Sequence, residues 1–276
     1  MSKAKNSYVS AGHRVMTEGT MEFKIFAWKF SIMSVKNLVT KLENNSKLLQ
    51  EGTEERFNGY GLMGLTFKSG HVLALRRFMA SSIGPGYRSV WHRAPGGRWS
   101  FYADVEPSRS CARYFGEQVT DAITEPINIS WTGEKNFKVE IENTGFQWQV
   151  SLCSTPATGM INLAAGIMPG SWWKNKKILK LMSRIAGKVL GAGHVGLSGF
   201  VPNRQYFIAN PYKLWLVSES HATLDGEDFG APGPLTEQAH LKDFWIPQKG
   251  IFALGLAYFE PFNKENHSAN YCRTGL

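Results

Sequence analysis

The sequence is poor in cysteine. Only Cys111, Cys153 and Cys272 occur in 276 residues, and they stand far apart. An odd, widely spaced set without a C-x-x-C pair predicts neither a disulfide framework nor a zinc site. We therefore predict no bound metal and a reducing compartment, the cytoplasm.

The short motifs of the common catalytic and nucleotide sites are also missing. The sequence has no G-x-x-x-x-G-K-[ST], no G-x-S-x-G and no H-E-x-x-H, and no G-x-G-x-x-G stands between a predicted strand and a predicted helix. Their absence disfavours phosphate-loop and dinucleotide sites, α/β-hydrolases and zinc peptidases, and no cofactor is predicted. Sites assembled from separated residues remain open, and so does the question whether the protein is an enzyme.

Long apolar runs are lacking too. The most hydrophobic early segment, residues 21–33, is interrupted by Glu22, Lys24 and Lys29, and no run approaches the roughly 18 residues of a membrane span. The polar N-terminus lacks the apolar core of a signal peptide. The predicted organisation is a flexible tail (1–20), a single β-rich domain (21–262) with a helical insertion (157–191), and a peripheral tail (263–276).

Acidic residues are absent over one long stretch. Residues 143–218 contain no Asp or Glu but eight Lys and Arg, while the whole chain carries a formal charge of +9. The rest of the chain is therefore close to neutral. This asymmetry predicts a basic patch that faces an anionic partner. The alternative is a solvated helix face whose neutralising acids lie elsewhere in the fold.

Aromatic residues (13%) and 28 glycines are what the sequence has in plenty. Apolar and polar residues alternate with period two from Ile127 to Leu152, which is typical of antiparallel strands with one face on a core. Turn signals at 68–71 and 94–97 predict two further hairpins. The apolar run 251–259 predicts a central strand that is covered on both faces.

Helical periodicity appears in three places. Residues 34–50 predict a helix capped by Ser34, and residues 157–168 predict a short one. Residues 172–190 predict an amphipathic helix. Its apolar stripe comprises Ile178, Leu181, Met182, Ile185 and Val189, and a basic row runs along the opposite face at Lys176, Lys180, Arg184 and Lys188. The segment 22–32 fits a strand or a helix equally well.

Hairpins thus predominate over strand–helix–strand units. We predict an α+β, β-rich fold: an antiparallel curved sheet or barrel with a helical insertion. The chain is similar in texture to lipocalin-like barrels and to acetoacetate-decarboxylase-like β folds. The second resemblance implies a lysine that forms a Schiff base with substrate, and no lysine here stands in a recognisable context for that role.

Two polar features point to a ligand site. Arg76 and Arg77 are consecutive in an apolar strand, so one of them should point inwards, where a guanidinium needs a carboxylate or a ligand anion. The alternative partner is an internal carboxylate such as Asp104 or Glu140.

The second feature is the hairpin at 87–105. Arg98, Tyr102 and Asp104 share one strand face near His92, and if that face lines an interior they could orient a ligand and move a proton. The alternative is that this face meets water.

Two further features are ambiguous. His221 precedes Asp225, Glu227 and Asp228, which could form a proton-transfer or metal site, although Asp and Gly also occur in turns for backbone reasons. The pair Trp172 and Trp173 leads into the basic row, which fits either an interfacial helix on an anionic membrane or a helix docked by its apolar stripe over a pocket.

From these features we predict a binding protein for a small, mostly apolar ligand with an acidic or carbonyl group. Arg76, Arg77, Arg98 and Tyr102 are the expected ligand contacts, and His92 and Asp104 are the proton carriers if there is chemistry. One alternative is a peripheral membrane protein at the inner face of the membrane, using helix 172–190. Another is a structural protein without a pocket. Lysines bind phosphate without reading sequence, so nucleic acid is disfavoured.

Overall fold

The computed structural model describes residues 34–44, 49 and 51–269. The first helix, α2 (Val35–Asn44), begins where the sequence predicts, because the hydroxyl of Ser34 accepts a hydrogen bond from the amide of Asn37. The ambiguous segment 22–32 lies outside the described residues.

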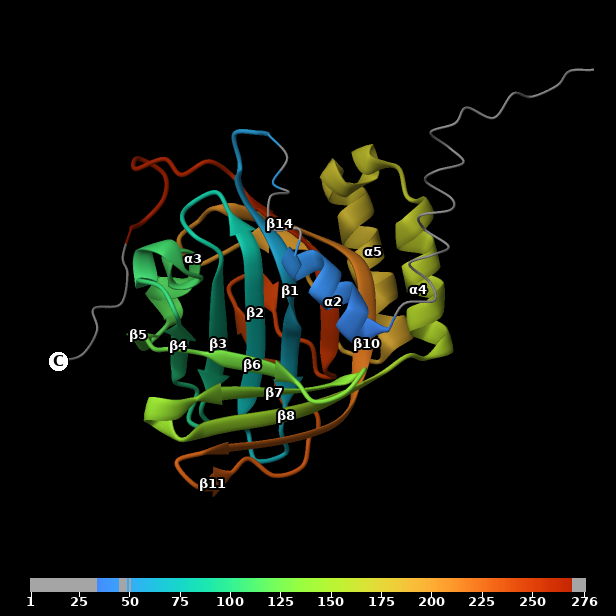
Figure 1. Cartoon of the computed structure of the whole chain (residues 1–276). Helices are drawn as coiled ribbons and strands as arrows, with labels where there is room; N and C mark the ends of the chain where they lie inside the picture. The colour runs from blue at the N-terminus through green and yellow to red at the C-terminus, as the bar shows by residue number, and fades with distance from the viewer. Residues whose placement is uncertain (1–33, 45–48, 50, 270–276) are drawn as a thin grey trace, which may run out of the picture. The chain divides into compact units, whose positions relative to one another are not determined.

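The main sheet is a strongly curled path of ten strands, in the order β5-β4-β3-β2-β1-β14-β10-β8-β7-β6 (Figure 1). The strands are β1 (Glu55–Thr66), β2 (Val72–Ser81), β3 (Tyr87–Arg93), β4 (Trp99–Ala103), β5 (Asp121–Thr124), β6 (Asn128–Trp131), β7 (Asn136–Ile141), β8 (Phe146–Cys153), β10 (Tyr206–Leu224) and β14 (Ile251–Phe259). No pairing joins β5 to β6 within the described residues, so the sheet is a half-barrel. The predicted β-rich α+β class is confirmed.

Strand β14 holds the two halves of the sheet together. It pairs antiparallel with β1 on one side and with β10 on the other, so the strand is central as predicted. Residues 251–254 are buried on both faces, whereas 255–258 are only partly buried. Short strands lie beside this path: β9 (Ser198–Phe200) and β11 (Glu227–Asp228) pair with β10, and β12 (His240–Leu241) pairs with β13 (Phe244–Trp245).

Strand β10 is one continuous strand of 19 residues. β10 runs through Pro211 without ending, because a register shift against β14 falls between Pro211 and Lys213. A second shift against β8 falls between Val217 and Glu219. Proline is tolerated at such bulges because the ladder is already interrupted there.

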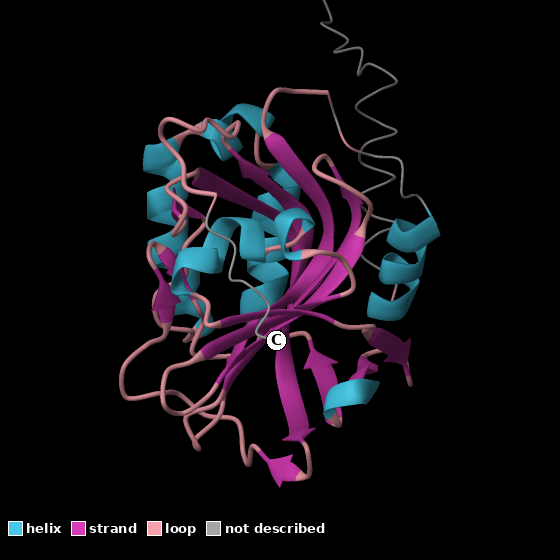
Figure 2. Ribbon diagram, turned by 90° about the vertical axis from the view of Figure 1, so that its left-hand side faces the viewer, coloured by secondary structure: helices cyan, strands magenta, loops and turns pink. Residues whose placement is uncertain are grey.

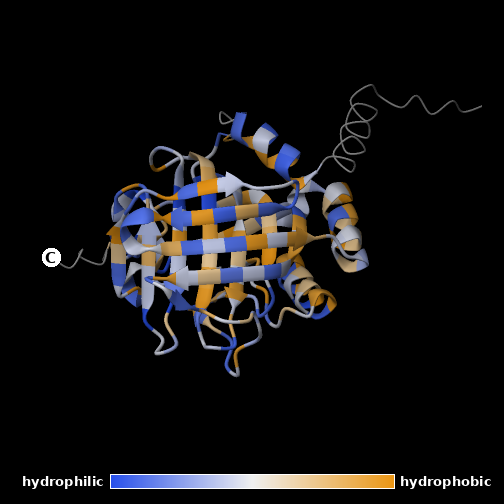
Figure 3. Cartoon of the chain, turned by 60° about the horizontal axis from the view of Figure 1, so that its bottom comes forward, coloured by the Kyte–Doolittle hydropathy of each residue, from blue (hydrophilic) through white to orange (hydrophobic). Residues whose placement is uncertain are grey.

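The curl of the sheet creates two cores. Strands β6–β8 fold across the outer face of β1–β3, and their inward residue Phe137 packs on Phe252 of β14 with ring centroids 5.6 Å apart (Figure 1). Figure 3 shows the matching alternation of polar and apolar segments along these crossing strands. The opposite face of β1–β4 holds a second aromatic core around Trp91, Phe101 and Phe115.

Helices cover this second face (Figure 2). They are α3 (Ala112–Phe115), α4 (Pro156–Ile167) and α5 (Lys176–Leu190), with the adjoining 3-10 turns η1 (Pro107–Arg109), η2 (Gly116–Gln118) and η4 (Gly170–Lys174). A further 3-10 turn, η3 (Glu142–Thr144), connects β7 to β8. No helix of the described ranges is both long and apolar enough to cross a bilayer.

Helix α4 is fixed at both its start and its middle. Thr155 and Thr158 form a reciprocal capping box at its N-terminus. The amide side chain of Asn162 then pairs with the main chain of Leu214 in β10, accepting from its N–H at 2.8 Å and donating to its carbonyl at 2.9 Å. This pairing ties α4 to the strand immediately after the Pro211 bulge.

Helix α5 differs from its prediction in two ways. It begins at Lys176 rather than 172, because the Asn175 side chain accepts hydrogen bonds from Lys177 and Ile178 as an N-cap. The predicted apolar stripe is also only partly buried: Ile178 and Met182 are half-buried, Leu181, Ile185 and Val189 are exposed, and the fully buried residues are Leu179, Ser183, Gly187 and Leu190. Ser183 and Gly187 on this buried face leave room for the loop that follows the helix, which returns close against it.

Gly187 illustrates the closeness of that contact. A Cβ atom at this position would clash with the carbonyl oxygen of Gly193. We expect Gly187→Ala to lower the free energy of unfolding by about 1–3 kcal/mol, because backbone rather than a flexible side chain must move. Urea denaturation measures this, with Gly159→Ala as the control, since nothing lies within 4 Å of a Cβ there. Equal stability of the two variants would contradict the expectation.

Candidate functional site

A cavity of about 330 Å³ lies between the second face of the sheet and the helices α4 and α5. Its wall is almost entirely apolar. Aromatic rings of β1, β2, β3 and α3 line one side, and Met168, Trp173, Met182 and Leu190 line the helical side. A structural protein without an internal pocket does not fit this arrangement.

Arg76 is the one charged residue among the residues that line the cavity in the described part of the chain. It lies on β2 and is 5% exposed. Its Nη1 donates to the carbonyl oxygens of Leu62 at 2.7 Å and Leu75 at 2.8 Å, and its Nη2 donates to that of Met63 at 3.3 Å. Leu62 and Met63 lie where the β1–β2 register shifts, so the bulge supplies the acceptors.

The Arg76 guanidinium is held without a countercharge. No carboxylate of the described residues forms an ion pair with it, while the rings of Trp91 and Phe244 lie 4.6 and 5.7 Å from its Cζ atom. Burial lowers the pKa of Arg76 to about 10, so the group still carries its charge at neutral pH. A buried cation that faces a cavity without a carboxylate is a strong electrostatic feature.

Further polar groups surround Arg76. Ser89, its cross-strand partner on β3, has a buried hydroxyl without a hydrogen-bond partner in the described structure. The Tyr87 hydroxyl and the Cys111 sulfur line the cavity 3.3 Å apart. Burial raises the pKa of both the Tyr87 hydroxyl and the Cys111 thiol, so both are neutral at physiological pH.

Arg77 points away from the cavity, as the alternation along β2 requires. Its Nε lies 3.8 Å from a carboxylate oxygen of Glu43 in α2. The predicted internal ion pair for this strand is wrong in its partners, because Asp104 binds Arg88 at 2.9 Å and Glu140 binds Lys138 at 2.7 Å.

Arg98, Tyr102 and Asp104 do not line the cavity. Arg98 is an exposed residue that pairs with Asp121 at 3.0 Å. Tyr102 is buried on the same face as Ser100, opposite the rings of Trp99 and Phe101, which belong to the aromatic core, and burial raises the pKa of its hydroxyl. Alternation in β4 thus separates the predicted polar cluster from Arg76.

His92 lies in a separate buried group. Its Nε2 is 2.9 Å from Nδ1 of His71, and Phe229 stacks on both imidazoles. Burial, together with the neighbouring His71, lowers the pKa of His92 to about 4. The His92 imidazole therefore stays neutral in the folded protein at physiological pH.

This shift predicts a pH dependence of stability. Below pH 6.5 the unfolded chain takes up a proton at His92 that the folded protein does not bind until about pH 4. The free energy of unfolding should therefore fall by up to about 3 kcal/mol as the pH drops through this window. Urea denaturation across that range should show a flatter curve for His92→Gln than for the wild type. Parallel curves would contradict this assignment. His221→Gln, at an exposed histidine, serves as the control.

Of the remaining predicted residues, all but Trp173 lie near the surface. Trp173 is buried and lines the cavity, whereas Trp172 is 48% exposed. Lys176, Lys180, Arg184 and Lys188 are all exposed. His221 lies 3.7 Å from Asp228 on the surface, and no group of three metal-ligating side chains occurs in the described ranges.

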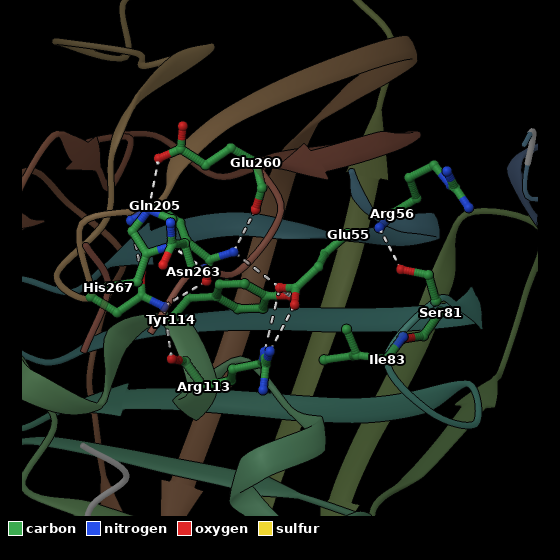
Figure 4. A network of polar contacts seen from close by, with 12 residues as sticks. Glu55, Arg56, Ser81, Ile83, Arg113, Tyr114, Gln205, Glu260, Asn263 and His267 are labelled. Atoms are coloured by element: carbon green, nitrogen blue, oxygen red, sulfur yellow. Dashed lines mark hydrogen bonds and ion pairs between the residues drawn. The ribbon is translucent and has the colours of Figure 1, made fainter. Parts of the chain in front are cut away.

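Sequence analysis missed a second polar cluster beside the cavity (Figure 4). The Tyr114 ring lines the cavity, and its hydroxyl donates to Glu55 at 2.6 Å. The same carboxylate accepts from Arg113 at 2.7 Å and from Gln205 at 3.1 Å. Glu55 and Gln205 are 150 positions apart in sequence, so no local sequence pattern predicts this contact.

The molecule is thus an α+β half-barrel with an apolar cavity, and the buried guanidinium of Arg76 forms part of the cavity wall. No family model matches the sequence, and no curated protein matches it either. Among solved structures, the crystal structure of acetoacetate decarboxylase from Legionella pneumophila is similar, with a TM-score of 0.34 and 8% identity. The match covers 84% of this chain and 97% of that chain.

Proposed function

We propose that this protein binds a small amphiphile with an anionic head group, of which a fatty acid is the simplest example. The observation that carries the proposal is Arg76: a buried, protonated guanidinium that faces an apolar cavity and has no carboxylate partner among the described residues. A carboxylate at this point would supply the missing countercharge through a charge-assisted hydrogen bond.

The available donors support an anionic head group. The three hydrogen bonds of Arg76 use three of the five N–H groups of a guanidinium. The other two N–H groups remain for a head group. In a cavity with so few polar groups, these donors fix the orientation of the ligand.

The rest of the wall suits an alkyl chain. Phe57, Phe78 and Phe259 lie on the sheet side, and Ile161, Ala165 and Met182 lie on the helical side. The volume of about 330 Å³ falls at the lower end of the usual range for ligand pockets. A medium-chain acid therefore fits the proposal better than a long-chain one.

Binding is better supported than catalysis. The thiol of Cys111 is kept neutral by burial, which makes it a poor nucleophile. No lysine is among the residues that line the cavity in the described structure, so the cavity offers no amine for a Schiff base. His92 and Asp104, the predicted proton carriers, do not line it either.

Calorimetric titration with decanoate and with 1-decanol tests the proposal. The two probes share one alkyl chain and differ in the head group. We expect decanoate to bind at least about tenfold more tightly, because only its carboxylate can pair with Arg76. Equal affinities, or no binding of either probe, would contradict the proposal that the cavity prefers ligands with an anionic head group. Mass spectrometry of the purified protein should also find a retained acidic amphiphile.

A further inference from the structure

Helix α4 exposes apolar residues and contains no charge. Met160, Leu163 and Ile167 share one face and are 62%, 69% and 76% exposed. The helix sequence PATGMINLAAGI has no Lys, Arg, Asp or Glu at all. A surface helix normally turns charged or polar residues to water, so an uncharged helix with such an outer face suggests a partner.

Helix α5 also exposes apolar residues, and it adds a basic row. Leu181, Ile185 and Val189 are 57%, 52% and 41% exposed. Lys180, Arg184 and Lys188 each precede one of these residues by one position. Neighbouring positions on a helix are about 100° apart, so the two rows run side by side along α5. Between the helices, Trp172 of η4 is half exposed.

We propose that the α4–α5 hairpin, residues 156–190, docks on an anionic lipid surface. Its exposed apolar residues would enter the interface between head groups and acyl chains, Trp172 would lie at that boundary, and the lysines and Arg184 would contact lipid phosphates. The surrounding sequence, residues 143–218, contains no acid to oppose this contact. The charge therefore selects an acidic membrane.

Two other partners fit the surface less well. A second copy of the chain would bring the basic row against an identical basic row, which costs energy through like-charge repulsion. Nucleic acid would engage the lysines but would give the exposed Leu and Ile side chains nothing apolar to contact. A lipid surface satisfies both rows together.

The same hairpin forms one wall of the cavity, which connects docking to ligand exchange. Ile185 lines the cavity and is also half exposed, so the cavity reaches the surface beside α5. On a docked molecule this opening would face the bilayer, from which an amphiphile could enter without crossing water. This link rests on the proposed function, but the docking itself does not.

Co-sedimentation of the full chain with vesicles tests the docking. We expect binding to phosphatidylcholine vesicles that contain phosphatidylglycerol, little binding to pure phosphatidylcholine, and weakening by salt. Lys180→Glu/Arg184→Glu should reduce the partition coefficient roughly tenfold or more. Leu163→Asn/Ile167→Asn should reduce it as well, because the apolar contact is also lost.

Lys68→Glu/Lys135→Glu is the matched control, since it changes net charge equally at exposed positions outside the hairpin. It should bind almost as the wild type does. Equal losses in the control and the hairpin variant would reduce the effect to net charge and overturn the proposal. The absence of binding to acidic vesicles would also overturn the proposal. If the protein then formed a dimer that Leu163→Asn/Ile167→Asn dissociates, the surface would bind a second copy of the chain instead of lipid. The vesicle experiment contains no decanoate, so it tests the docking independently of ligand binding. Binding to vesicles without binding of decanoate would contradict only the proposed function.

Discussion

Arg76→Met should weaken decanoate binding about a hundredfold while leaving 1-decanol binding nearly unchanged. Methionine retains much of the length of the side chain but removes the buried charge and its hydrogen bonds. A hydrogen bond to a charged group is worth about 1.5–3 kcal/mol, and its loss in an apolar cavity lies at the upper end of that range. Calorimetric titration of both ligands against the variant measures the change.

Arg98→Leu is the control for this experiment. It removes an arginine that sequence analysis also predicted as a ligand contact. In the structure, Arg98 lies on the surface and pairs with Asp121. Its affinity for decanoate should stay within about twofold of the wild type, as expected for an exposed group. If Arg98→Leu and Arg76→Met lose affinity equally, the ligand is not held where we place it. Thermal denaturation of both variants establishes that each is folded.

Glu55→Ala should lower the free energy of unfolding by about 3–5 kcal/mol, the range expected when one partner of a buried ion pair is removed. Glu55 is 13% exposed at its side chain and binds Arg113, Tyr114 and Gln205 (Figure 4). Its removal takes the carboxylate partner from a largely buried guanidinium and the acceptor from a buried phenol. Chemical denaturation provides the measurement.

Asp121→Ala provides the contrast. The pair of Asp121 with Arg98 is an exposed ion pair, with side-chain exposures of 34% and 69%. We expect a loss of less than about 1 kcal/mol. If the two variants were equally destabilised, the network around Glu55 would contribute no more than a surface pair does, contrary to its burial and its number of bonds.

Local patterns predicted much of this fold. The alternating segment between Ile127 and Leu152 and the apolar run at 251–259 form strands as expected. The turns at 68–71 and 94–97 connect β1 to β2 and β3 to β4. Period-two and period-3.6 patterns report which residues share a face, and that information is carried by short segments.

The same patterns failed where the choice between faces depended on distant contacts. The apolar stripe of α5 predicted its buried face only in part, because small residues at 183 and 187 allow the loop around Gly193 to approach on that side. Alternation predicted that one of Arg76 and Arg77 points inwards, and in the structure it is Arg76 that lines the cavity. Its partners are main-chain carbonyls at a bulge, which residue identities do not reveal.

Strand β14 has a consequence for how the polypeptide matures. It lies between β1 and β10, and Leu62 of β1 pairs with Phe252 of β14. One edge of β1 therefore has no neighbouring strand until β14 has been synthesised. During translation, β1 therefore emerges long before its partner is synthesised, and one edge stays open to other strands. Nascent chains halted before residue 251 should consequently bind chaperones or aggregate, whereas release of the last strand should allow rapid closure.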